Sequence, residues 1–345
     1  MCTNLSIPRK SKDGALVSAR TMDWCIKLPQ NPPVVNFVPR GQSFPEIDLP
    51  GQIQWKNKYG FIGAGEESEE YPIAYSDGLN EAGLSAASLW LSCSEYQKPK
   101  KGKCNLYNVS VVSYVLGNFK TIQEVESALS KLRILSINDV FPDHYPVLLH
   151  YIFSDISGNH LIVEFINGVM RTYINDLGVL TNQPTYDWHL TNLNMYGNLS
   201  LVDNPDLVCG EEVTGSGQLG IPGDPSPQSR FIRAAFLRET AFKPQTIQES
   251  IGLARQILQN ISVPIGTVIF ADPPFPEITF DWTQWSVIRD HTNLSYYFYS
   301  DFNSTLYGIH FKDLDLNSSK QKQIPIYQPD WYEDVTKKLK PIDRS

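Results

Sequence analysis

The chain lacks long apolar runs. No uninterrupted apolar stretch approaches the roughly 20 residues that a helix needs to cross a bilayer, and polar residues follow Met1 where a signal peptide would have its apolar core. We therefore expect a soluble, cytoplasmic protein with no membrane partner. A chain trimmed to its mature start would have the same pattern, so a periplasmic origin stays open.

An excess of positive charge is also missing. The chain has 29 Lys and Arg residues against 37 Asp and Glu residues, a formal net charge of -8, and a pI near 5.3. Binding along a phosphate backbone requires the opposite balance. This composition excludes nucleic acid as an expected partner.

Cysteines are few and scattered. No C-x-x-C pair or Cys/His spacing typical of a metal site occurs, and the odd number predicts at least one free thiol. The five are Cys2, Cys25, Cys93, Cys104 and Cys209.

The composition is that of a globular protein. Of 345 residues, 41% are hydrophobic and 19% are charged, which provides a sizeable core and no bulk sign of disorder. No linker divides the chain. We expect one domain over residues 1–345, of which 317–345 form a polar, Pro-punctuated surface extension.

Strand patterns dominate the chain. Apolar and β-branched runs with strand character cover residues 15–23, 34–39, 83–92, 147–155, 160–166, 169–174, 283–290 and 305–311.

Two helices are predicted by the same start pattern, Thr-Ile-Gln-Glu. Thr121 with Glu124, and Thr246 with Glu249, have the spacing of a capping box, and each is followed by an amphipathic stretch. Further helices are expected over 107–117 and 228–241. Gly117 is placed to end the first of these in a left-handed conformation. Four helices therefore accompany many strands.

Cys2 is the residue that most directly suggests chemistry. A small residue after Met1 favours removal of the methionine, which would give Cys2 both a thiol and a free α-amine. An α-amino group has an ordinary pKa of about 7.7–8.0, so part of it is unprotonated near neutral pH and takes the thiol proton. This pair needs no catalytic histidine. Taken alone, Cys2 is better interpreted as an ordinary terminal residue, and the rest of the sequence reverses that judgement.

An apolar strand ends in the segment 19–24 (ARTMDW). Alternation places Arg20 and Met22 on one face and Asp23 on the other, unless the strand bends or bulges. An arginine near the sulfur favours the thiolate, and a carboxylate near the α-amine holds it in position. A surface ion pair at the end of a strand is the alternative interpretation.

With Cys2-Thr3 and this segment, the chain resembles the choloylglycine hydrolase family, which includes bile salt hydrolases and penicillin V acylases. The family belongs to the N-terminal nucleophile hydrolases. The resemblance continues, in the family's order, through residues 77–84 (DGLNEAGL), 180–184 (LTNQP), 187–188 (DW), 192–193 (NL), 229–231 (SRF) and 283–290 (TQWSVIRD).

This resemblance implies an α+β fold, the four-layer αββα sandwich, and a homotetramer. It implies that Cys2 is the nucleophile and, through its α-amine, the base. Arg20 and Arg230 would be the positive charges around Cys2. Asp23 would be the partner of the α-amine of Cys2. No metal or cofactor is required. Arg230 also has an ordinary interpretation, as a charge near the start of a helix.

The resemblance also implies an oxyanion site. Asn182 would donate its side-chain amide to the tetrahedral intermediate, and the second donor would be the backbone N–H of Trp90. Asn182 before Gln-Pro is otherwise a natural turn residue. Asn80 and Gly83 are assigned to a structural turn between two apolar runs.

The side chains of Met22, Trp24 and Trp90 predict the substrate. Together they would form an apolar, aromatic acyl pocket beside Cys2, although Trp24 and Trp90 would also suit a core. Bile salt hydrolases commonly have Asn where this chain has Trp90, whereas the penicillin V acylase relatives of Gram-negative bacteria share both tryptophans. We therefore rank penicillin V and N-acyl homoserine lactones above conjugated bile salts, which are the alternative small-molecule acyl amides.

Two rival interpretations stay open at this point. One is a Cys-His hydrolase or acyltransferase that uses an internal cysteine such as Cys93 or Cys209 with one of the six histidines. The other is a small-molecule binding protein on the same fold, which the loss of Cys2 or Asn182 would favour. Both residues are present.

Overall fold

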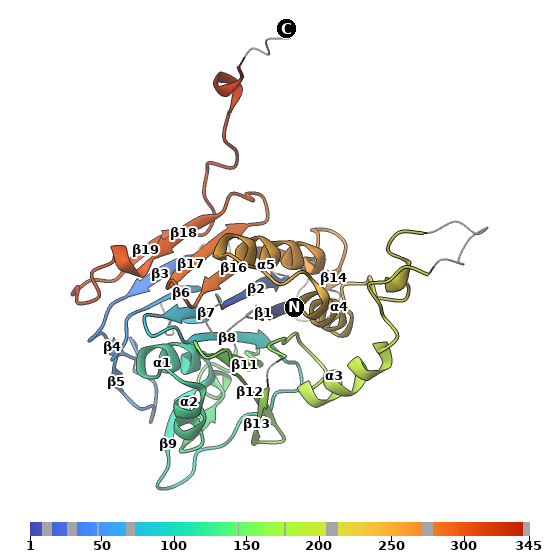
Figure 1. Cartoon of the computed structure of the whole chain (residues 1–345). Helices are drawn as coiled ribbons and strands as arrows, with labels where there is room; N and C mark the ends of the chain where they lie inside the picture. The colour runs from blue at the N-terminus through green and yellow to red at the C-terminus, as the bar shows by residue number, and fades with distance from the viewer. Residues whose placement is uncertain are drawn as a thin grey trace.

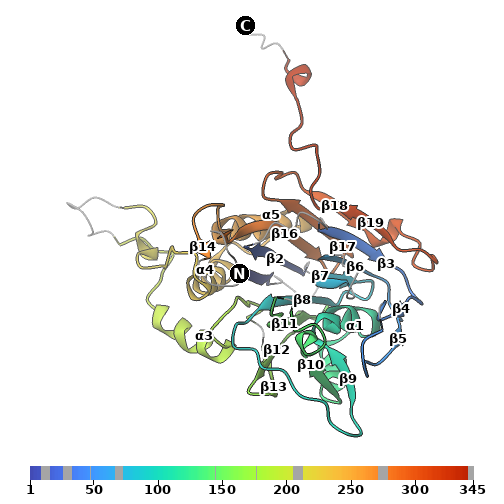
Figure 2. The same ribbon diagram turned by 180° about the vertical axis from the view of Figure 1, so that it is seen from behind.

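Two large antiparallel sheets stack face to face, and helices cover their outer faces (Figures 1 and 2). The predicted αββα sandwich is confirmed. The computed structural model describes residues 1–8, 16–25, 33–46, 48–66, 73–143, 145–175, 177–204, 213–270 and 279–340.

The smaller sheet carries the N-terminus. Helices α4 (Pro227–Thr240) and α5 (Ile247–Ile261) pack against its outer face. In the described residues its strand order is β1 (Cys2–Ile7), β2 (Val17–Trp24), β16 (Trp282–Asp290), β17 (Ser295–Ser300) and β18 (Tyr307–His310).

The larger sheet is covered on its outer face by α1 (Val111–Asn118) and α2 (Ile122–Leu129). Its order is β13 (Val169–Asn175), β12 (His160–Ile166), β11 (Leu149–Ser154), β8 (Ser85–Trp90), β7 (Ala74–Asn80), β6 (Phe61–Glu66), β3 (Val34–Val38) and β19 (Lys322–Pro325).

Strand alternation divides the side chains between two cores. Ala86 of β8 packs beneath α1, whereas its neighbour Ala87 faces the smaller sheet. Because α4 and α5 cover one face of the smaller sheet and the larger sheet covers the other, β1 and β16 are buried along their whole length, although β1 is an edge strand. This double cover also buries their polar residues, such as Asn4 and Arg289, which hydrogen-bond to each other.

Both predicted capping boxes form. Thr121 and Thr246 accept hydrogen bonds from the backbone N–H of Glu124 and Glu249, whose side chains bond back to the caps. The prediction for Gly117 is wrong. Gly117 lies inside α1, and a Cβ there would lie 2.1 Å from Oδ1 of Asn57. Close packing explains this glycine.

Helix α3 (Tyr186–Leu193) was not expected from the sequence. Asn80 and Gly83 form the structural turn that was predicted: the Asn80 carboxamide accepts from the N–H of Leu84, and Gly83 has a φ of +79°.

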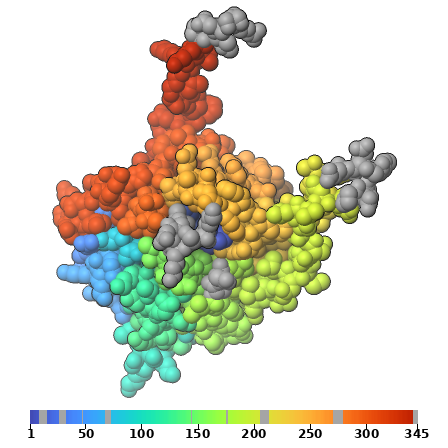
Figure 3. All heavy atoms as spheres, in the orientation of Figure 1, coloured from blue at the N-terminus to red at the C-terminus, as the bar shows by residue number. Residues whose placement is uncertain are grey.

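The C-terminal segment differs from expectation in part. Residues 322–325 form β19 on the edge of the larger sheet, and the next residue, Ile326, is buried. Residues 328–331 stay on the body, because carbonyl oxygens of this segment accept hydrogen bonds from Asn303, Thr305 and Tyr307. The described residues after them leave the body as a projecting arm (Figures 1 and 3). No helix in the described ranges is long and apolar enough to cross a membrane.

Short elements complete the described chain. They are β4 (Ser43–Phe44), β5 (Trp55–Lys56), β9 (Cys104–Tyr107), β10 (Leu132–Leu135), β14 (Ile269–Phe270) and β15 (Thr279–Phe280), with 3-10 turns at Asn108–Ser110, Ile137–Asp139, Asn194–Tyr196, Ser216–Gln218, Phe311–Asp313 and Thr336–Lys338.

Candidate active site

Cys2 opens β1 between the two sheets. It pairs with Met22 of β2 and is 3% exposed. Its sulfur lies 3.1 Å from Nη2 of Arg20, which also lies 3.1 Å from Sδ of Met22. Arg20 and Met22 therefore share one face of β2, as strand alternation predicted.

A buried carboxylate holds Arg20. Asp77 of β7 lies 3.6 Å from Nη1 of Arg20, and the hydroxyl of Tyr296 donates to Asp77 at 2.7 Å. Burial lowers the pKa of Arg20, but the charges of Cys2 and Asp77 raise it more, and the net pKa lies above its ordinary value. Arg20 is therefore a fixed cation beside the thiol.

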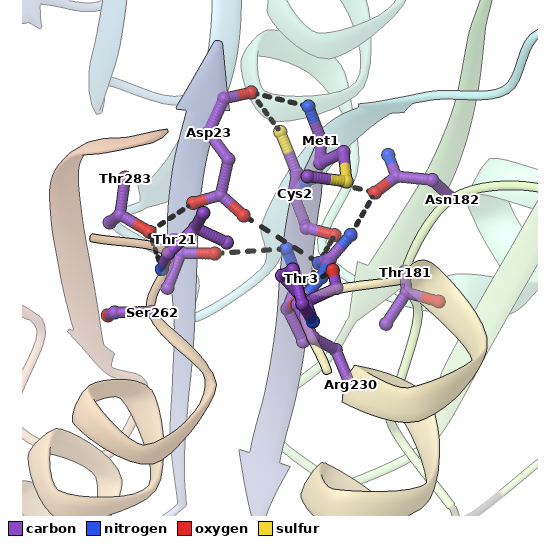
Figure 4. Close-up of polar contacts among 12 residues, drawn as sticks. Met1, Cys2, Thr3, Thr21, Asp23, Thr181, Asn182, Arg230, Ser262 and Thr283 are labelled. Carbon is purple, nitrogen blue, oxygen red and sulfur yellow. Dashed lines mark hydrogen bonds and ion pairs between the residues drawn. The ribbon is translucent and has the colours of Figure 1, made fainter. Parts of the chain in front are cut away.

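Asp23 points to the other face of β2 (Figure 4). Its Oδ1 accepts a hydrogen bond from the hydroxyl of Thr283 at 2.6 Å, and its Oδ2 lies 3.7 Å from Nη1 of Arg230. The ladder between β2 and β16 is irregular here, with a register shift between Thr283 and Trp285. The extra residue lies in β16, so β2 keeps the alternation that places Asp23 opposite Arg20 and Met22.

Asn182 and Arg230 meet at the backbone of Cys2 (Figure 4). The nitrogen of Cys2 donates to Oδ1 of Asn182 at 2.7 Å, and Nη2 of Arg230 donates to the same oxygen at 2.7 Å. Nη1 of Arg230 donates to the carbonyl oxygen of Cys2 at 2.6 Å. Nδ2 of Asn182 donates to the carbonyl oxygen of Trp90 at 2.8 Å, which brings the two expected oxyanion residues into contact.

Arg230 lies in the first turn of α4, where the helix dipole disfavours a cation. Burial lowers its pKa, and the charges of Asp23 and Cys2 oppose this effect. A surface helix charge would not be completely buried. Arg230 is therefore not a surface helix charge, and its guanidinium contacts the backbone of Cys2.

The loop that carries Asn182 is supported by buried histidines that the sequence analysis did not single out. Nε2 of His189, on α3, lies 2.9 Å from the carbonyl oxygen of Asn182, and its ring stacks on Phe231. Burial lowers the pKa of His189 to about 4, so the ring is neutral and its Nε2–H donates. His150 contacts the carbonyl oxygen of Thr181 at 2.9 Å.

Met1 lies beside this site. Its amino group donates to the carbonyl oxygen of Asp23 at 2.7 Å and forms an ion pair with Asp281 at 3.1 Å. In this structure the nitrogen of Cys2 is therefore a peptide nitrogen, and its hydrogen-bond partner is Asn182. The predicted contact between the Cys2 α-amine and the carboxylate of Asp23 stays a prediction.

A cavity of about 280 Å³ opens beside the sulfur of Cys2 and is lined mainly by apolar side chains. Met22, Trp24 and Trp90 lie in its wall, as expected. Tyr145, which no sequence pattern indicated, completes an aromatic group. The ring centroids of Trp24 and Trp90 are 5.3 Å apart, and Tyr145 lies 5.6 and 5.4 Å from them.

The histidines do not favour the Cys-His alternative. Both ring nitrogens are taken by other groups in His150, His160 and His291. Cys93 is exposed, and Cys209 lies outside the described residues. Within the described ranges no cluster of His, Cys, Asp or Glu is arranged to hold a metal ion.

A sandwich of two sheets covered by helices, with a buried cysteine at the start of the first strand, is the architecture of the N-terminal nucleophile hydrolases. The chain belongs to the choloylglycine hydrolase family of linear amide C–N hydrolases, whose family model matches residues 2–324. It is thus a hydrolase of C–N bonds other than peptide bonds.

Relatives by sequence include two activities. A bile salt hydrolase/transferase of Clostridium perfringens is 34% identical over 280 residues, covering 77% of this chain and 80% of the relative. A penicillin V acylase of Pectobacterium atrosepticum is 29% identical over 318 residues, covering 87% and 78%.

Solved structures show the same two activities. A variant of the conjugated bile acid hydrolase from Clostridium perfringens matches with a TM-score of 0.82 at 28% identity, over 97% of this chain and 100% of that chain. The penicillin V acylase from Agrobacterium tumefaciens matches with a TM-score of 0.75 at 27% identity, over 94% and 91%. These similarities establish the family and leave the substrate undecided.

Proposed function

We propose that this chain is an N-terminal cysteine amidohydrolase whose nucleophile is the thiolate of Cys2. The contact between Nη2 of Arg20 and the sulfur of Cys2, inside an apolar cavity, carries this proposal. The sulfur attacks the carbonyl carbon of the substrate amide and forms a tetrahedral intermediate.

The α-amine of Cys2, released when Met1 is removed, is the proposed base. It takes the thiol proton, then gives a proton to the leaving nitrogen, and finally activates the water that hydrolyses the thioester. Asn182 supports this assignment because its Oδ1 lies 2.7 Å from the nitrogen that becomes the amine. Asp23 and Arg230 form the charged pair behind it.

Asn182 and the backbone N–H of Trp90 are the proposed oxyanion donors. The carboxamide nitrogen of Asn182 carries two hydrogens, of which one is used by the carbonyl oxygen of Trp90. The second is available to the oxyanion. Two such donors stabilise charge that develops only in the transition state.

The aromatic group predicts the acyl part of the substrate. Trp24, Trp90 and Tyr145 offer faces on which a phenoxyacetyl group stacks or along which a medium fatty chain lies. A rigid steroid needs a wider cleft, and the side chains of Trp24 and Trp90 would narrow this one. We therefore rank penicillin V, cut at the amide outside its β-lactam ring, and N-acyl homoserine lactones ahead of conjugated bile salts.

Sequence similarity favours the second candidate, conjugated bile salts. Two relatives at 34% and 30% identity are bile salt hydrolase/transferases, whereas the penicillin V acylase relative is 29% identical. Sequence similarity therefore supports bile salts at least as well as the aromatic pocket supports penicillin V and acyl homoserine lactones. The choice between these substrates requires a measurement.

The deciding experiment compares kcat/KM for penicillin V, long-chain acyl homoserine lactones, glycocholate and taurocholate in one preparation. Higher values for the first two classes support the ranking. A bile salt value well above both overturns it. Trp90→Asn should shift the preference toward bile salts, because it opens the aromatic wall and keeps the main-chain donor. An unchanged preference would assign specificity to the neighbouring loops.

We also propose the homotetramer that the family resemblance suggests. The segment after α3 projects from the body (Figure 3) and exposes apolar side chains, among them Met195, Val202 and Leu219. Light scattering coupled to size-exclusion chromatography tests this assembly, and a monomeric mass would contradict it.

A further inference from the structure

Glu66 is an acidic side chain in the wall of the otherwise mainly apolar cavity. It is the last residue of β6 and pairs with Ala74 of β7, and the cavity that it lines also contains Cys2, Trp24 and Trp90. Its side chain is half-buried. Among the residues that the structure describes, it has no hydrogen-bond or ion-pair partner.

Other polar side chains of this wall have partners within the protein. The hydroxyl of Ser76 donates to Ala64 at 3.3 Å, and that of Ser88 donates to the carbonyl oxygen of Ser76 at 3.3 Å. Nδ2 of Asn108 donates to Val147 at 2.7 Å. Glu66 therefore differs from them in presenting unused acceptors to the cavity.

The surroundings of Glu66 make this arrangement costly without a ligand. Burial raises the pKa of its carboxyl to about 7. The cation of the cavity, Arg20, is already held by Cys2 and Asp77. The pKa of Tyr327 is raised mainly by burial, and the charge of Glu66 adds to that effect. An unpaired carboxyl in a mainly apolar wall is stabilised when a bound group supplies a hydrogen bond.

We propose that Glu66 is a specificity-determining residue that selects acyl groups carrying a hydroxyl, which it binds within the acyl pocket. This inference rests on the proposed amidase function. A hydroxyl both donates and accepts, so it pairs with the ionised carboxyl and with the neutral acid alike. An ammonium group would lose more hydration on entering an apolar wall, and a keto group can only accept.

The test compares matched substrates that differ in one substituent. N-octanoyl, N-β-hydroxyoctanoyl, N-β-ketooctanoyl and N-β-aminooctanoyl homoserine lactones are hydrolysed by the wild type, Glu66→Gln and Glu66→Leu. Glycocholate and glycodeoxycholate, which differ by one hydroxyl, form a second series. Glu95→Leu, a matched change at an exposed carboxylate, is the control.

We expect the wild type to favour the hydroxylated member of the series that it cleaves by roughly 3- to 10-fold in kcat/KM, which is the effect of one hydrogen bond. Glu66→Leu should lose this preference but should still cleave the unsubstituted substrate. Glu66→Gln should keep part of the preference, and the control Glu95→Leu should keep all of it.

Three results overturn the inference: a hydroxyl preference that survives in Glu66→Leu, a larger preference for the amino substrate, and loss of turnover on every substrate in a folded Glu66→Leu. Failure of the proposed function is distinguishable, because the wild type would then cleave neither series.

Discussion

Nη2 of Arg20 lies 3.1 Å from the sulfur of Cys2, and both side chains are buried. The guanidinium also donates to the carbonyl oxygens of Ser76 and Ser88. These contacts fix the cation in place, so its charge is directed at the sulfur. A flexible cation could not do this as well.

The first prediction concerns this cation. Arg20→Lys should lower kcat by about 100-fold, because an ammonium cannot keep the contacts to Ser76, Ser88 and the sulfur together. Iodoacetamide should alkylate Cys2 more slowly at neutral pH in this variant. Asp77→Asn, which keeps the shape of the partner, should have a smaller effect on both measurements. Unchanged alkylation in Arg20→Lys would contradict the role of Arg20.

The second prediction concerns the N-terminus. Active protein should begin at Cys2, because retained Met1 makes the nitrogen of Cys2 an amide, which is no base at neutral pH. Mass spectrometry of the active fraction tests this, and full activity in protein that retains Met1 would refute the mechanism. Cys2→Ser should fold but lose most turnover, because a hydroxyl ionises far less than a thiol.

The third prediction separates the role of Asn182 from substrate binding. Asn182→Ala should lower kcat by roughly 100- to 1000-fold with a smaller change in KM, as expected for the loss of one oxyanion donor. Steady-state kinetics on the best substrate of the panel measures both. An effect confined to KM would remove Asn182 from the oxyanion site.

The fourth prediction concerns His189 and pH. Its pKa is about 4 in the folded protein and ordinarily 6.5, so between these values the unfolded chain binds more protons, and stability falls as pH falls. His189 alone should remove about 2 kcal/mol of unfolding free energy between pH 7 and pH 5.

Urea unfolding of the wild type and His189→Gln at both pH values tests this. The variant should lose less stability on acidification, and an identical loss would contradict the prediction. Any fall in kcat should come from displacement of Asn182, so it should leave the pH profile of kcat unchanged. A changed profile would revive a catalytic histidine.

The fifth prediction uses two helical glycines. Gly117→Ala should destabilise the protein by about 1–3 kcal/mol, because the new Cβ would overlap the side chain of Asn57. Gly252→Ala is the matched control, since no atom lies within 4 Å of its Cβ position. That change should stabilise α5 by roughly 0.5–1 kcal/mol. Equal effects at the two sites in thermal unfolding would rule out the packing explanation.

Local chemistry explains which features the sequence predicted. A capping box such as Thr121 with Glu124 depends on residues three positions apart, and the shared face of Arg20 and Met22 follows from the period of a strand. Asn182 and Arg230 lie far from Cys2 in the sequence. Only the resemblance to the family predicted that they lie close to Cys2 in the fold.

Other features depend on contacts that no local pattern encodes. Tyr296 reaches Asp77 across 219 positions, and Gly117 is small because of Asn57 in another segment. Tyr145 comes from a loop without a regular period, and Glu66 looks like an ordinary polar residue at the end of a strand. The contacts of these residues can be identified only in the folded structure, where the two sheets stack.

The two ends of the chain differ as sites of attachment. A purification tag fused ahead of Cys2 would block the proposed amine and would have to fit where Met1 now contacts Asp23 and Asp281. The arm beyond Trp331 projects into solvent, and Tyr332 and Leu339 on it are largely exposed. A C-terminal linker to a resin or a reporter would therefore leave the sandwich and its cavity undisturbed.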